Sequence, residues 1–180
     1  FFEKPAVITN IKETKKYDFN GSVAVFQDSA LVFRKNQGFE DFRTKTEIGN
    51  HSVFAIGSVS KQFTAVMVLR LCETGKIRLQ DLVSEYLSSF HENPAYRAIT
   101  ISQLLCHTSG ISDSGNGLLF KNGSGFGYSN KGYYYLGKLI EKISGKSFDQ
   151  NAHELFRMAG MSSSYTSDHF NGNHFANAYL

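Results

Sequence analysis

The chain has 180 residues, of which 41% are hydrophobic and 19% charged, a balance that fits one globular domain with a sizeable core. Its formal net charge of +3 is too small to indicate a nucleic-acid-binding protein, and like charges do not gather in blocks. The sequence has no apolar run long enough to span a membrane. Composition and charge therefore fit one globular domain and give no indication of a nucleic-acid-binding or membrane-spanning role.

Residues 1–57 are predicted to form the sheet part of the domain. Over residues 21–27 the side chains alternate between two faces, with Val23 and Val25 on one and Ala24 and Phe26 on the other. A turn at Asp28-Ser29 follows, and the strand pattern resumes over residues 31–34, which indicates a hairpin. Residues 53–56 form a short apolar run that leads the chain to Ser58.

Residues 59–74 contain no helix breaker, and Gly75 supplies a stop signal. Apolar side chains cover most of the circumference of this predicted helix, a pattern typical of a helix that is buried all round. Ser58 stands where the helix begins, and Lys61 follows three residues later. That spacing places both side chains on one face.

The pair formed by Ser58 and Lys61 carries the first chemical hypothesis. A hydroxyl near a helix N-terminus lies where backbone N–H groups favour developing negative charge. An amine in apolar surroundings loses its proton more easily, and such an amine is one known activator of a serine nucleophile. The alternative is a helix N-cap followed by an exposed lysine. The pair alone does not decide between them, and that alternative is the commoner one.

Residues 58–161 are predicted to be mostly helical. A short amphipathic helix is expected over residues 79–87. Capping-box patterns at residues 100–103 and 147–150 predict two further helix starts. Between them, a helical pattern that follows Tyr128-Ser129-Asn130 ends at Gly145. Strands first and helices afterwards indicate an α+β fold.

The remaining residues give little indication of chemistry. Residues 162–180 are rich in polar side chains without a clear period, and we expect a polar tail there. Cys72 and Cys106 have neither metal-binding nor disulfide spacing, so buried free thiols are expected. His169 and His174 are the only candidates for a metal site, and we expect none.

Three stretches, in this order and in this helical context, point to one family. Ser58-Val59-Ser60-Lys61 begins a helix, His107-Thr108-Ser109-Gly110 follows a short helix, and Tyr128-Ser129-Asn130 opens another helix. Together they resemble the serine β-lactamase and penicillin-binding protein superfamily, most closely its class C β-lactamase-like branch. That branch also contains D-alanyl-D-alanine peptidases and esterases. The resemblance runs from about Gly21 to Met161.

The resemblance implies a role for each site residue. Ser58 would be acylated, Lys61 would assist proton transfer, and Tyr128 would be the general base. Asn130 would orient the substrate amide and Lys61, while the backbone N–H of Ser58 would form half of an oxyanion hole. A phenol with a pKa of about 10 needs that pKa lowered to act as a base at neutral pH, and a nearby ammonium does so. His107 is implied to be structural, and no cofactor is implied.

Tyr128-Ser129-Asn130 also has a plainer interpretation. Serine and asparagine before a helix are ordinary N-cap residues, and the tyrosine could simply pack. Because the chain also contains Ser58 and Lys61, the catalytic interpretation that the family resemblance implies is favoured over the N-cap interpretation.

The chain departs from the family pattern in two ways. A Lys-Thr-Gly, Lys-Ser-Gly or His-x-Gly triplet is expected downstream of Tyr128, and the sequence does not contain it. The connection from Gly110 to Tyr128 is also shorter than is common in the family. Within it, the glycine-rich residues 115–127 lack the signature of a phosphate-binding loop and are interpreted as a simple connecting loop. We expect the strands that complete the sheet to lie outside this chain, which would leave the apolar face that they cover exposed. A fragment is the favoured explanation, ahead of a partner chain or a degenerate parent.

We therefore expect a serine hydrolase that acts by acyl transfer on a β-lactam, a D-alanyl peptide or a small ester. The resemblance implies a periplasmic or secreted protein. One alternative is a non-catalytic relative that binds β-lactams or peptidoglycan peptides, or an inactive fragment. A further alternative is a structural α+β domain with chance motif matches. Nucleic-acid partners are not expected.

Overall fold

The computed structural model describes residues 19–115, 117–168, 170, 172 and 174–177. The chain divides into two compact units. One contains residues 1–55 and 172–180, and the other contains residues 56–171. We call them the strand unit and the helical unit, and describe each by itself.

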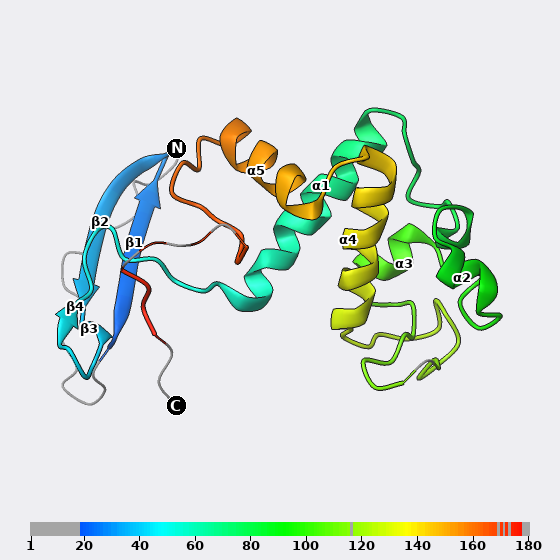
Figure 1. The fold of residues 1–180 in the computed structure, drawn as a ribbon, viewed down its shortest axis with the longest axis horizontal. Coiled ribbons are helices and arrows are strands. Elements are labelled where there is room, and N and C mark those ends of the chain that lie inside the picture. The colour runs from blue at the N-terminus through cyan, green and yellow to red at the C-terminus, as the bar shows by residue number, and fades with distance from the viewer. Residues whose placement is uncertain (1–18, 116, 169, 171, 173, 178–180) are drawn as a thin grey trace, which may run out of the picture. The chain divides into compact units, whose positions relative to one another are not determined.

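The strand unit contains the predicted hairpin (Figure 1). Strand β1 (Gly21–Gln27) pairs with strand β2 (Ala30–Gln37) in antiparallel register. Asp28 and Ser29 connect them with φ angles of 50° and 67°. Positive φ at both central residues is the geometry of a type I′ turn, whose twist matches that of the flanking strands. The hairpin prediction is confirmed.

The described part of this unit also contains two shorter strands. Strand β3 (Phe39–Asp41) pairs antiparallel with strand β4 (Thr46–Glu47). Glu40 of β3 is buried, and its carboxylate accepts a hydrogen bond from the hydroxyl of Ser52. This bond satisfies a charge that would otherwise be costly to bury.

The hairpin leaves apolar side chains exposed to solvent, as the sequence predicts. The large apolar side chains of β1 and β2 that are exposed are Val23, Val25, Phe26, Leu31, Val32 and Phe33.

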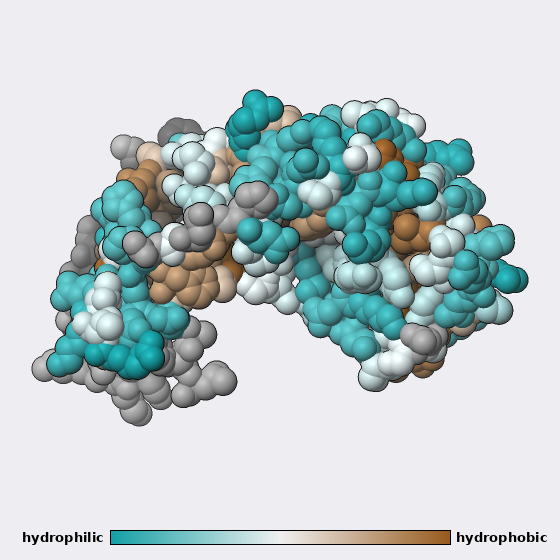
Figure 2. Space-filling view, in the orientation of Figure 1, coloured by the Kyte–Doolittle hydropathy of each residue, from teal (hydrophilic) through white to brown (hydrophobic). Residues whose placement is uncertain are grey.

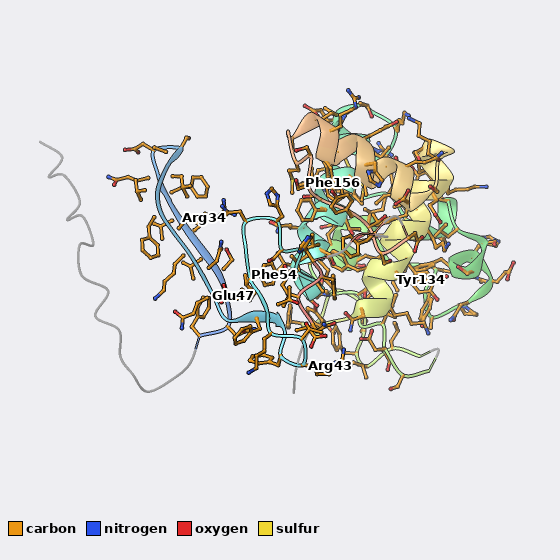
Figure 3. All side chains as sticks on the ribbon, turned by 60° about the vertical axis from the view of Figure 1, so that its left-hand side comes forward. Arg34, Arg43, Glu47, Phe54, Tyr134 and Phe156 are labelled. Atoms are coloured by element: carbon orange, nitrogen blue, oxygen red, sulfur yellow. The ribbon has the colours of Figure 1, made fainter. Side chains whose placement is uncertain are left out.

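The helical unit is arranged around three helices (Figure 1). A 3-10 turn (Gly57–Ser60) leads into α1 (Lys61–Glu73). Helices α4 (Asn130–Ser144) and α5 (Phe148–Met158) both contact α1 and also contact each other. Figure 3 shows Phe156 on the α5 side of this packing.

One hydrophobic core joins these helices. The ring of Phe156 meets that of Phe63 on α1 edge to face, with 5.5 Å between their centroids. The buried core residues of the helical unit are Met67, Val68, Leu71, Ile77, Val83, Phe90, Tyr96, Ile99, Ile101, Leu104, Ile111, Leu136, Leu139, Ile140, Ala152, Leu155 and Phe156. Because α1 and α4 share this core, their starting residues are held in fixed positions.

The predicted helix ends are confirmed. Thr100 at the start of α3 (Ile101–Leu105) and Ser147 at the start of α5 each form a complete capping box. Helix α4 ends at Gly145, whose φ of 71° is the left-handed conformation that glycine adopts without steric cost.

The amphipathic helix predicted over residues 79–87 is wrong. The structure has only a 3-10 turn at Val83–Glu85, followed by α2 (Ser88–Glu92). The carbonyl of Asp81 accepts the N–H of Ile101 at 3.1 Å. The stretch therefore pairs its backbone with a segment distant in sequence instead of closing the bonds of a helix.

Two predictions of burial are also wrong. Helix α1 is not buried all round, because α4 and α5 cover one side of it: Val68 is fully buried, whereas Val66 and Leu69 are 41% and 48% exposed. Cys72 is half-buried, and Cys106 is exposed because it lies just after the last residue of α3. Both thiols are free in the part of the chain that the structure describes.

None of the described helices is both long and apolar enough to cross a membrane. The face of the helical unit visible in Figure 2 is mostly hydrophilic, with small separate apolar patches.

Leu136 tests the shared core, because this residue of α4 has no exposed surface. We expect Leu136→Ala to lower the free energy of unfolding by about 2–5 kcal/mol, since it removes buried methyl groups and leaves a cavity. Urea unfolding followed by circular dichroism measures this loss. Lys142→Ala, at an exposed position of the same helix, is the control and should change stability by less than about 0.5 kcal/mol. Equal losses in both variants would contradict the core assignment.

Candidate active site

Ser58 and Lys61 lie at the start of α1, as their spacing predicts. Ser58 belongs to the 3-10 turn, and Lys61 is the first residue of the α-helix. The Lys61 ammonium donates a hydrogen bond to Ser58 Oγ over 3.2 Å. Ser58 is exposed and Lys61 is half-buried, so the hydroxyl is accessible to a substrate.

Tyr128 and Asn130, at the start of α4, complete the cluster. Tyr128 Oη donates to Ser58 Oγ over 2.7 Å. Asn130 Oδ1 accepts a hydrogen bond from Lys61 Nζ over 2.8 Å. The structure therefore brings together all four residues that the sequence singled out, from two helix starts in one unit.

The positive charge of Lys61 acts on the phenol of Tyr128. The Lys61 ammonium lies 4.8 Å from the centroid of the Tyr128 ring and 5.7 Å from that of Tyr133. Hydrogen bonding with Lys61, followed by that with Ser58, lowers the pKa of Tyr128 below its usual value of 10. Because Tyr128 is 48% exposed, solvent screens part of this effect. The direction is the one that a general base requires.

His107 contacts the cluster through one hydrogen bond and through ring packing. Its Nδ1 accepts a hydrogen bond from the backbone N–H of Ser129 over 3.2 Å. Its ring packs against those of Tyr128 and Tyr133, with centroid distances of 4.6 and 5.0 Å. Burial, followed by the charge of Lys61, lowers the pKa of His107. A neutral imidazole with an accepting Nδ1 fits a structural role.

Asp113 is the residue of this cluster that sequence reasoning missed. Its Oδ1 accepts hydrogen bonds from Ser129 Oγ and the backbone N–H of Lys131, each at 2.9 Å. Its Oδ2 accepts from the backbone N–H and from Nδ2 of Asn130, each at 3.0 Å. The backbone N–H groups of Lys131 and Asn130 are the main cause that lowers the pKa of Asp113 to about 2. No local sequence pattern identifies this aspartate, which lies in the loop before α4, well upstream of the helix start.

The geometry suits nucleophilic catalysis. Ser58 Oγ lies within proton-transfer distance of a phenol and an amine, the requirement for activating a hydroxyl. The described residues contain no group of three or more His, Cys, Asp or Glu side chains that could hold a metal ion. Open depressions lined by α5 residues such as Asp149 and His153 include none of the cluster.

Comparison with known proteins gives a family match over almost the whole chain. The family model described as Beta-lactamase matches residues 9–174. The D-alanine carboxypeptidase AmpC from Burkholderia cenocepacia has a similar structure, with a TM-score of 0.79 and 25% identity, over 92% of this chain and 50% of that chain. These findings confirm the resemblance to the superfamily and the α+β fold class.

Two curated relatives are similar in sequence. Penicillin-binding protein 4* of Bacillus subtilis (strain 168) is 30% identical over 174 residues, which cover 82% of this chain and 38% of that protein. Teichoic acid D-alanine hydrolase of Staphylococcus aureus is 30% identical over 150 residues, covering 74% of this chain and 37% of that protein. The chain thus spans less than two fifths of the length of either relative.

Replacing Lys61 tests the electrostatic link to Tyr128. We expect Lys61→Met to raise the pKa of Tyr128, because the variant removes the main interaction that favours the phenolate. NMR titration of ¹³C-labelled tyrosine rings measures it, with the Tyr128 signal assigned through Tyr128→Phe. Lys138→Met, which removes an ammonium 5.7 Å from the ring of Tyr134, should leave the Tyr128 midpoint unchanged. An unchanged midpoint in Lys61→Met would refute the link.

Proposed function

This chain belongs to the Beta-lactamase family, and from that premise we propose that it is the serine hydrolase part of an enzyme that acts by acyl transfer through a covalent ester on Ser58. One observation carries the proposal: Ser58 Oγ lies 2.7 Å from Tyr128 Oη and 3.2 Å from Lys61 Nζ. Acyl transfer requires a hydroxyl that can lose its proton to a neighbouring base, and a nearby cation makes that base more effective by stabilising its anion.

In the acylation step, Ser58 Oγ attacks the carbonyl carbon of the substrate and gives its proton to the phenolate of Tyr128. Lys61 stabilises that phenolate before the attack. The tetrahedral intermediate then expels its leaving group, which takes the proton from Tyr128. The backbone N–H of Ser58 is proposed as one donor to the oxyanion. The products are a Ser58 ester and the protonated leaving group, which is released from a peptide or ester and stays attached to the acyl group of an opened β-lactam.

In the deacylation step, water attacks the Ser58 ester. Tyr128 accepts a proton from this water and returns it to Ser58 Oγ as the acyl group leaves as a carboxylic acid. Asn130, bound to Lys61 over 2.8 Å, is placed to hold the ammonium in position and to contact the substrate amide. This cycle regenerates the starting site without a cofactor.

The proposed substrates are a D-alanyl peptide, a β-lactam or a small ester. The names of two similar proteins refer to D-alanine, one as a teichoic acid D-alanine hydrolase and one as a D-alanine carboxypeptidase. A D-alanyl ester or amide is therefore the first substrate class to test. We also propose a periplasmic or secreted location, as membership of this family implies.

Intact mass spectrometry tests the nucleophile. We expect incubation with benzylpenicillin to add the mass of one penicillin molecule to the parent chain and nothing to Ser58→Ala, because only Ser58 can form the ester. Slow loss of the adduct would indicate a peptidase, and rapid loss a β-lactamase. An adduct on both chains would place the nucleophile elsewhere.

A chain that forms no adduct with penicillin calls for a second acyl donor. Incubation with a D-alanyl thioester, followed by the same mass measurement, covers enzymes that do not react with β-lactams. Absence of both adducts, combined with measurable non-covalent binding, would favour a binding protein over an enzyme.

Tyr128→Phe tests the proposed base. The variant keeps the ring against His107 and removes only the hydroxyl that contacts Ser58. We expect the rate of acylation to fall about 10²- to 10⁴-fold, the usual contribution of general acid–base catalysis. The time course of adduct formation measures it, and Tyr134→Phe, at an exposed position of α4, is the control (Figure 3). A Tyr128→Phe variant that acylates at the parent rate would assign the base to another residue.

A further inference from the structure

We propose that Asp113 is a positioning residue of the active site, whose carboxylate fixes the orientation of the Asn130 amide so that its oxygen faces Lys61. This inference rests on the proposed function and adds a residue that the sequence motifs do not contain. It follows from the four hydrogen bonds that the carboxylate accepts.

The first step concerns the oxygen and the nitrogen of the Asn130 side-chain amide. Its oxygen accepts a hydrogen bond from the Lys61 ammonium over 2.8 Å, and its nitrogen donates to Asp113 Oδ2 over 3.0 Å. The terminal torsion of asparagine is soft, so the amide alone could rotate by half a turn. Rotation would set an NH₂ group against an ammonium, and both groups are donors only. The carboxylate, which only accepts, favours the orientation that leaves the oxygen to Lys61.

The second step concerns the backbone that carries Asn130. The same carboxylate accepts the N–H groups of Asn130 and Lys131, two of the unpaired donors at the start of α4. It also accepts the hydroxyl of Ser129, which in turn accepts the N–H of Gly132 over 3.0 Å. Main chain and side chain of Asn130 are therefore held by a single group.

The third step concerns what holds Asp113. Lys131 Nζ donates to the carbonyl of Gly115 over 2.6 Å, which ties the loop to the first turn of α4. Ser112, buried, donates its hydroxyl to the carbonyl of Ser114 over 2.7 Å. The loop around Asp113 thus has its own hydrogen bonds. The carboxylate is presented by a structured turn, as a positioning group requires.

Asp113→Ala, compared with Ser147→Ala, tests the proposal on this chain. Ser147 caps α5 with a complete capping box, so its variant loses a helix cap remote from the cluster. We expect Asp113→Ala to slow adduct formation on Ser58 by about 10- to 100-fold, because a displaced amide misplaces the reacting groups. Ser147→Ala should acylate at the parent rate per folded molecule. Asp113→Glu, which retains a carboxylate, should recover part of the lost rate.

A spectroscopic measurement makes the test independent of activity. The side-chain NH₂ signals of Asn130 in a ¹⁵N NMR spectrum, assigned through Asn130→Asp, should shift and exchange faster with water in Asp113→Ala. They should stay in place in Ser147→Ala. Asp113→Asn, which has nearly the same shape, replaces the alanine variant if that variant does not fold.

The outcomes separate the two proposals. A parent chain that acylates, together with an Asp113 variant that acylates within twofold of it, overturns the positioning role. Unmoved Asn130 signals in the Asp113 variant overturn it as well. A parent chain that forms an adduct neither with benzylpenicillin nor with the D-alanyl thioester overturns the proposed function of this chain, and the Asn130 signals still decide whether Asp113 orients the amide.

Discussion

The contact between the Lys61 ammonium and Asn130 Oδ1 is the interaction on which the site depends. It joins residues 69 positions apart, at the starts of α1 and α4. On the α1 side the ammonium also reaches Ser58, and on the α4 side it lies beside the ring of Tyr128. A cation shared in this way keeps the hydroxyl of Ser58 and the phenol of Tyr128 close together. The buried packing between α1 and α4 fixes where the contact can form.

The exposure of these groups makes the supporting residues important. Ser58, Tyr128 and Asn130 all face solvent, where single ion contacts contribute little free energy. The positions of these groups therefore depend on the residues that support them. His107 and Asp113 hold the same backbone segment at the start of α4. His107 accepts the N–H of Ser129, and Asp113 accepts the next two N–H groups and the Ser129 hydroxyl. Both come from the chain between α3 and α4.

The sequence predicted what depends on local spacing. The separation of Ser58 and Lys61 is a property of one helical turn, so it could be inferred without tertiary structure. The caps at Thr100 and Ser147 are likewise set within four residues. Tyr128, in contrast, was identified through the family resemblance, because nothing in its neighbours indicates that it meets Ser58.

The features that sequence reasoning missed all depend on contacts between distant segments. The stretch near Asp81 has the apolar spacing of a helix, but its carbonyl pairs with Ile101. The pattern around Leu69 indicates full burial, whereas burial depends on which neighbours pack against α1.

Asp113 is the sharpest case of the same limit. Its role is defined by four donors that lie 16 to 18 residues later, and three of these four belong to the main chain or to an ordinary N-cap serine. Main-chain donors exist at every helix start, so they leave no trace in the residue types. This helix start differs from others because the amide oxygen of Asn130 accepts a hydrogen bond from Lys61, so only the amide nitrogen is available to hold the side chain in place. A carboxylate, which only accepts hydrogen bonds, is the group that can bind that nitrogen.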